Sequence, residues 1–190
     1  ISGSLGALDN GNASTGHAVA VTVSGALSTT GSFGHGVVAQ SIGGGGGHLM
    51  GNSSQTSGMI TLGAQGKGGG NSMDVSVTVN DKMAVTTTGT GALGIVAQSI
   101  GGGGGLVDLP RATGVTLGGS SSSSGNGGNV VVNVNGAVAT SGDRSVGVLA
   151  QSVGGGGGAV VTSGTGTATP QLAGGSGNSG NVTVTVNAPI

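Results

Sequence analysis

A ten-residue segment that ends in five glycines occurs three times in this chain, and it constrains the fold more than any other feature. It reads VAQSIGGGGG at 38–47, VAQSIGGGGG at 96–105 and LAQSVGGGGG at 149–158. Glycine loses more conformational freedom on folding than any other residue, about 0.5–1 kcal/mol relative to alanine at each position. Five glycines in succession therefore either bind a ligand through their backbone or let segments of the chain pack closely.

The segment belongs to a longer repeat. Gln40, Gln98 and Gln151 are 58 and 53 residues apart, and a valine-rich pattern occurs four times, at 19–25, 75–81, 130–136 and 182–188. A repeat of about 55 residues is on the scale that indicates a solenoid or a similar array. We predict one repeat-built unit over 1–190, with repeats at about 18–73, 74–128 and 129–181, a partial repeat at 182–190, and the tail of a preceding repeat over roughly 1–16.

The elements inside a repeat read as short strands. Patterns such as VAVTVS alternate strictly and are rich in β-branched residues, and no helical periodicity is present. The step from Val23 to Gln40 is nearly constant from repeat to repeat, and it favours one coil of a right-handed parallel β-helix, in which like residues stack on like. The sequence thus predicts an all-β solenoid. Asparagines that follow the valine strands fit a side-chain ladder or a turn equally well, namely Asn80, Asn135 and Asn187.

The glycine runs are best interpreted as structural. The strand before each run is apolar on both faces, and a thin glycine segment could cover the outer face. We expect the three runs to be ordered, partly buried and side by side, in an extended or polyproline-II-like conformation. The residues predicted to carry this structural repeat are Gln40, Gln98, Gln151, Gly43, Gly45, Gly101, Gly103, Gly154 and Gly156.

A phosphate-binding loop is the competing interpretation, and the pattern fails it. The one Gly-Lys pair, Gly66-Lys67, is followed by Gly68, and Thr61 stands where the first glycine should be. No helix is predicted after any glycine run.

Composition excludes several further functions. The net charge is −1, aromatic residues are represented by Phe33 alone, and there is no cysteine. The chain therefore lacks a basic patch or stacking platform for nucleic acid, a disulfide and a thiolate metal site. The sequence contains no run of about 18 apolar residues, so it predicts no membrane-spanning segment. The chain opens at Ile1 and is expected to be a piece of a longer protein.

No residue or motif in the sequence indicates a particular catalytic or binding chemistry. His17, His35 and His48 form no H-x-x-x-H pattern, and His35 occupies a place held by Leu93 and Val146 in the other repeats, which favours a packing or surface role. The five aspartates are dispersed, and Asp108 has no counterpart at the other glycine runs. We predict no catalytic residue, no metal, no cofactor and no enzymatic activity; a polysaccharide-active enzyme is the least favoured alternative.

A row of threonines suggests a second function. Thr22, Thr78 and Thr183 recur near the strand centres, and Asn133 interrupts the row. A flat ladder of threonines could form a glycan-binding or ice-binding face, although β-propensity and solubility explain the same residues.

The pattern G-[VI]-[VL]-A-Q-S-[IV]-G-G-G-G-G, preceded by V-x-V-[NS]-G-x-[LV]-x-T-[ST]-G, resembles the glycine-rich repeats of very large autotransporter passenger proteins of Gram-negative bacteria. The resemblance covers nearly the whole chain. It implies a β-helical passenger exported across the outer membrane to the cell surface, and it does not imply whether the passenger adheres or is only a stalk. The regular apolar strands and glycines and the few, dispersed ionisable groups lead us to expect a stalk, with an adhesive surface as a second role. Its partners would be neighbouring repeats and a host-cell or glycan surface. The residues 80–83 depart from the pattern and leave the tight turn of that repeat an open question.

Overall fold

The computed structural model describes residues 3–5, 14–51, 59–63, 69–110, 114–119, 124–163 and 170–190. These residues form strands and turns, and none of them lies in a helix. The described chain accordingly holds no helix long and apolar enough to cross a membrane. All strand pairs are parallel, so the predicted all-β solenoid is confirmed.

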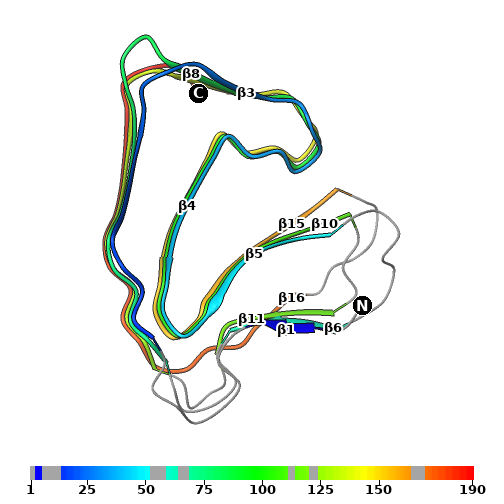
Figure 1. The fold of residues 1–190 in the computed structure, drawn as a ribbon, viewed down its shortest axis with the longest axis vertical. Coiled ribbons are helices and arrows are strands. Elements are labelled where there is room, and N and C mark those ends of the chain that lie inside the picture. The colour runs from blue at the N-terminus through cyan, green and yellow to red at the C-terminus, as the bar shows by residue number, and fades with distance from the viewer. Residues whose placement is uncertain are drawn as a thin grey trace.

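The strands form five parallel sheets, called A to E here, which Figure 1 shows end-on. Sheet A contains β1 (Gly3–Leu5), β6 (Met59–Leu62), β11 (Gly114–Leu117) and β16 (Pro170–Leu172). Sheet B contains β2 (Val19–Val23), β7 (Val75–Val79), β12 (Val130–Val134) and β17 (Val182–Val186). Sheet C contains β3 (Leu27–Thr29), β8 (Ala84–Thr87) and β13 (Ala137–Thr140). Sheet D contains β4 (Val37–Ile42), β9 (Ile95–Ile100) and β14 (Val148–Val153), and sheet E contains β5 (Gly46–Met50), β10 (Gly104–Leu109) and β15 (Gly157–Thr162).

One coil of the solenoid is one whole repeat. The first coil runs from β2 to β6, the second from β7 to β11 and the third from β12 to β16, and each adds one strand to every sheet. Gln98 lies opposite both Gln40 and Gln151, so like residues stack as predicted. The prediction that the step from Val23 to Gln40 makes a coil is wrong, because that step joins two strands of the same coil. Strand β1 pairs with β6, which confirms the tail of a preceding repeat.

The sequence pattern does not distinguish the strands of sheet E from those of sheet A. Residues 159–166 resemble 58–64 in pattern, but their first part belongs to β15, which pairs with β10. The counterpart of β6 and β11 in the third coil is β16. Side chains in sheet E differ from coil to coil, which hides the repeat of these strands from pattern matching.

The chain folds back on itself within each coil, so that sheet E lies between sheets D and A (Figure 1). Sheets B, C and D enclose the largest apolar cluster, which includes Val77, Val85, Ile95 and Val132. Sheets D and E meet around a second cluster of Leu93, Val96 and Leu106, and sheets E and A meet around Leu62, Val107, Leu109, Val115 and Leu117. The middle strands β9 and β10 therefore pack on both faces, as the two-sided apolar pattern of sheet D indicates, whereas Val38 on the outer face of β4 is exposed.

The glycine runs make the reversal from sheet D to sheet E. Gly44, Gly45, Gly46 and Gly47 have φ values of 84°, 94°, 134° and 140°, and the other two runs repeat these values closely. The runs are ordered, largely buried and side by side, as expected. Of the two predicted conformations, the polyproline-II-like one is wrong, because it has a negative φ, and the extended one holds for the last two glycines of each run, which begin the strands of sheet E. The outer face of sheet D is covered by the apolar residues of sheet E, and the glycines allow the chain to turn back there.

Stacking places each of these glycines against a glycine of the next coil. A Cβ on Gly46 would lie 1.9 Å from the carbonyl oxygen of Gly104, and one on Gly104 would lie 1.8 Å from that of Gly157. At the start of the runs, the Gly43 N–H donates to the Ile100 carbonyl at 2.9 Å. The predicted structural role of the runs therefore agrees with their geometry.

Polar ladders run beside the glycines. The Gln40 Nε2 donates to Gln98 Oε1, and the Gln98 Nε2 donates to Gln151 Oε1, both at 2.7 Å. The hydroxyl of Ser99, the serine of the A-Q-S pattern in the second repeat, donates to the Met73 carbonyl at 2.7 Å and accepts from the Gly128 N–H at 2.8 Å. These bonds join consecutive coils through polar side chains set among the apolar columns.

The asparagines after the valine strands form side-chain contacts between coils. The Asn80 Nδ2 donates to Ser24 Oγ at 3.1 Å, and the Asn187 Nδ2 donates to Asn135 Oδ1 at 2.8 Å. The divergent turn at 80–83 is closed by Lys82 in the left-handed region, with φ 61°. The ladder interpretation is thereby confirmed for these pairs.

We predict that Gly104→Ala lowers the free energy of unfolding by about 3 kcal/mol or more, because the methyl group meets the Gly157 carbonyl and the backbone has φ 136°. The matched control is Gly25→Ala, where a Cβ meets nothing within 4 Å. Chemical denaturation followed by circular dichroism measures both. Equal stability of the two variants would contradict the stacking of the runs.

Candidate functional site

Three polar side chains occupy positions that are apolar in the neighbouring coils. His35 aligns with Leu93 and Val146 in the turns before sheet D. In sheet E, His48 aligns with Leu106 and Ala159, and Asp108 aligns with Met50 and Val161. Several of these apolar counterparts belong to the cluster between sheets D and E, namely Leu93, Leu106, Ala159 and Val161. The three polar replacements thus fall at one place in the cross-section.

Local structure brings the three side chains to that place. His35 follows a turn in which Phe33 has φ 55°, and the Gly36 N–H then donates to the Leu93 carbonyl at 2.9 Å. His48 lies in β5 directly after the glycine reversal, and Asp108 lies in β10 of the next coil. The reversal turns β5 and β10 toward the turn that carries His35. Residues 73 and 60 positions apart therefore meet.

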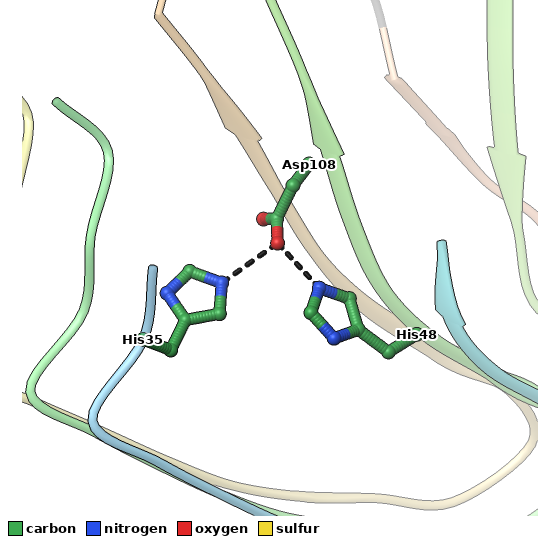
Figure 2. A group of neighbouring side chains, drawn as sticks. All are labelled: His35, His48 and Asp108. Atoms are coloured by element: carbon green, nitrogen blue, oxygen red, sulfur yellow. Dashed lines mark hydrogen bonds and ion pairs between the residues drawn. The ribbon is translucent and has the colours of Figure 1, made fainter. Parts of the chain in front are cut away.

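The carboxylate of Asp108 points between the two imidazole rings (Figure 2). Its Oδ2 is 2.7 Å from His35 Nε2, and it is also hydrogen-bonded to His48 Nε2. The ring centroids are 5.4 Å apart. The side chain of Asp108 is 0% exposed, that of His35 is 2% exposed, and that of His48 is 23% exposed. One oxygen of a buried carboxylate therefore accepts two hydrogen bonds from the first coil.

Burial and the histidines act in opposite directions on this carboxylate. Burial alone would raise the pKa of Asp108, but hydrogen bonds from His35 and His48, and the charge that the rings carry when protonated, lower it below its ordinary value of 3.8. The other oxygen, Oδ1, is buried without a hydrogen-bond partner. The cluster thus holds a negative charge whose hydrogen bonds all end on Oδ2.

Two imidazoles and a carboxylate are a donor set that suits transition metals, and the three candidate atoms lie within 4.8 Å of one another. The hydrogen bonding of His35 argues against a metal. The Leu93 N–H donates to His35 Nδ1 at 2.9 Å, so the neutral ring carries its proton on Nε2 and donates to Asp108. A metal on Nε2 would need the proton on Nδ1, facing the Leu93 N–H. The geometry therefore favours a hydrogen-bonded cluster.

The cluster also lacks the parts of a nucleophilic site. Within the described ranges, the hydrogen bonds of the two imidazoles lead to Asp108 and Leu93, and none leads to a hydroxyl group. A serine or threonine nucleophile needs such a bond to a base. Asp74 and Asp81 stand at opposite ends of β7, roughly 20 Å apart at about 3.3 Å per residue, which is too far for a pair of glycosidase carboxylates.

His35 and His48 form no motif in the sequence, but the structure brings them together at Asp108. His35 does occupy a packing position, as predicted, but it meets a carboxylate there. The sequence does contain a signal for this cluster, because three polar residues replace apolar ones at equivalent positions of the repeats. This signal becomes visible only when the strands of sheet E are recognised as repeated strands. His17 lies exposed before β2, away from the cluster, and the Gly66-Lys67 pair lies outside the described residues.

The threonine row differs from the predicted one at its last member. Thr22 and Thr78 are register partners, and Asn133 lies next to Thr78, but the residue beyond Asn133 is Thr185. Thr183 belongs to the other outward row, opposite Val131. The prediction of Thr183 is therefore wrong, because it shifts the strand by two residues.

Comparison with known proteins gives no match: no protein-family model, no curated protein and no solved structure matches this chain.

We predict that Asp108→Asn destabilises the protein most at pH above about 4. Because folding lowers the pKa of Asp108, its carboxylate contributes stability above 3.8, and that contribution disappears as the pH falls through the lower folded-state pKa. The difference in unfolding free energy between the two proteins, of about 3 kcal/mol near neutral pH, should shrink between pH of about 5 and 2. Asp143→Asn, at an exposed turn, is the control. A difference that stays constant over this range would contradict the assignment.

Proposed function

We propose that this chain is a structural segment of an extended, surface-displayed passenger and acts as a stalk. The observation that carries the proposal is the register of the five sheets, in which each strand pairs with its counterpart one repeat away. Such an array grows along one axis as repeats are added, because each coil contacts only its neighbours. A stalk needs length and stability more than it needs a reactive site.

The distribution of charge supports the same role. The sequence holds nine charged residues, and the described ones that lie in turns are exposed, including Asp81, Lys82, Asp143 and Arg144. Backbone ladders and apolar columns supply most contacts between coils. The stability of a filament built in this way depends little on pH and salt, which suits the exterior of a cell.

The cell-surface location rests on the resemblance of the AQS-pentaglycine repeat to autotransporter passengers. In this proposal the chain is exported across the outer membrane, carries out no catalysis, and has neighbouring repeats as its constant partners. A host-cell or glycan surface is its external partner where the passenger also adheres. Antibodies raised against this chain should label intact cells of the source bacterium, and labelling that requires permeabilised cells would contradict the proposal.

An adhesive face is the second candidate function, and one observation favours it. The outer face of sheet B carries Thr22, Thr78, Asn133 and Thr185 in register, with Ala20, Ser76, Val131 and Thr183 beside them. This face is built of small side chains in regular rows, which suits repeated contact with a glycan or with ice. If the chain is only a structural stalk, a glycan array and an ice-recrystallisation assay should give no signal from this face. A signal that Thr22→Ala and Thr78→Ala abolish would support the adhesive function.

The stalk proposal predicts the length of extended chains. Three further copies of residues 74–128, inserted after residue 128, should lengthen the particle by about 14 Å, at about 4.8 Å for each coil. The cross-section should stay the same, and small-angle X-ray scattering measures both quantities. A cross-section that grows with the number of copies would exclude the stalk.

A further inference from the structure

The most regular ladders of this solenoid, those of glutamine, glycine and valine, do not distinguish one coil from another. The glutamine ladder, the glycine columns and the valine rows have the same residue types at the junction of the first and second coils as at the junction of the second and third. A coil could therefore form the same ladders with a wrong neighbour, either in its own chain or in a second copy. A repeat protein with interchangeable junctions is prone to such misassembly.

The His35–Asp108–His48 cluster does distinguish a junction, because within the described ranges it occurs between the first and second coils and not between the second and third. Both histidines belong to the first coil, whereas Asp108 and Leu93 belong to the second. Each of its hydrogen bonds crosses from one coil to the other: His35 to Asp108, His48 to Asp108, and the Leu93 N–H to His35. At the junction of the second and third coils, the corresponding residues of the third coil are Val146, Ala159 and Val161.

The burial of Asp108 makes this junction selective. Its side chain is 0% exposed, and Oδ1 already lacks a partner, so the two imidazoles supply all of its side-chain hydrogen bonds. A coil with valine and alanine in place of the histidines would leave a buried carboxylate with no donor. An unpaired buried charge is strongly unfavourable, whereas apolar residues of similar volume in place of a whole buried cluster are often tolerated. The cluster thus penalises wrong neighbours more than it stabilises the right one.

We propose that the cluster is a specificity contact that determines which coil covers the Asp108 face of the second coil. The partner it selects is a coil that presents two imidazole donors, at the positions of His35 and His48. It rejects apolar coils, including the third coil of a second copy of the chain. This inference concerns the order of coils and does not depend on the proposed stalk function.

The first test separates selectivity from stability. His48→Leu alone should lower the thermal midpoint by about 10 °C, because it leaves Asp108 with one donor. The triple variant His35→Leu, His48→Leu and Asp108→Val, which uses residues found at these positions in other coils, should recover most of that loss. Circular dichroism at neutral pH measures both variants.

The second test reads the order of the coils. The chain has no cysteine, so cysteine pairs can be placed at Ser28 and Thr86, which are register partners, or at Ser28 and Ala139, which are two coils apart. The first pair is about 4.8 Å apart and can form a disulfide, whereas the second is about 10 Å apart and cannot. With the cluster intact, only the first pair should cross-link within one chain. In the triple variant, cross-links of the second pair within one chain should rise at least tenfold, because such a link requires the first coil to leave the Asp108 face.

Three results would overturn the proposal. The first is a triple variant that keeps only the Ser28–Thr86 cross-link, because coil order would then not need the cluster. The second is a triple variant that does not fold, because the cluster would then serve stability. The third is a midpoint that zinc raises in the unaltered protein but not in His48→Leu, because the imidazoles would then be metal ligands.

Discussion

Coils that stack about 4.8 Å apart leave no room for a side chain where one chain reversal lies on another, and the rest of the structure depends on this constraint. Gly46, Gly104 and Gly157 form a column in which a Cβ on either of the first two would collide with the next carbonyl. The same residues have positive φ, which turns the chain from sheet D back into sheet E. Without this reversal, sheet D would lose its outer cover, and the clusters around Leu106 and Val107 would have no second wall.

The reversal also creates a charged site between sheets D and E. Among the described residues, it is the one charged site in that part of the interior. The reversal sets β5 and β10 against the turn before β4, so that His48 and Asp108 meet His35. The Leu93 N–H orients the His35 ring, and this bond decides the chemistry, because it makes Nε2 a donor. A site with the composition of a metal centre therefore has the hydrogen bonding of a buried carboxylate held by imidazole donors. The difference lies in one backbone N–H.

Much of the fold could be predicted because the repeat is regular where backbones stack. The valine strands and the AQS strands recur with the same residues, and their register follows from matching like with like. Prediction failed where coils differ: sheet E has His48, Leu106 and Ala159 at one position, so no pattern marks it as a repeated strand. The predicted coil was too short for the same reason, since a coil looks complete before sheets E and A are counted. The error at Thr183 came from aligning residue types instead of positions within the strand.

The sequence by itself determined that this chain stacks parallel strands of like residues and that its glycine runs lie together, because alternation, β-branching and repetition are local properties of the chain. Only the tertiary structure decided which way the chain turns after each run and which side chains meet. His35, His48 and Asp108 are dispersed along the sequence, and their contact requires both the reversal within a coil and the step from one coil to the next. Contacts that combine these two displacements follow no fixed spacing, and so the candidate site could not be read from the sequence.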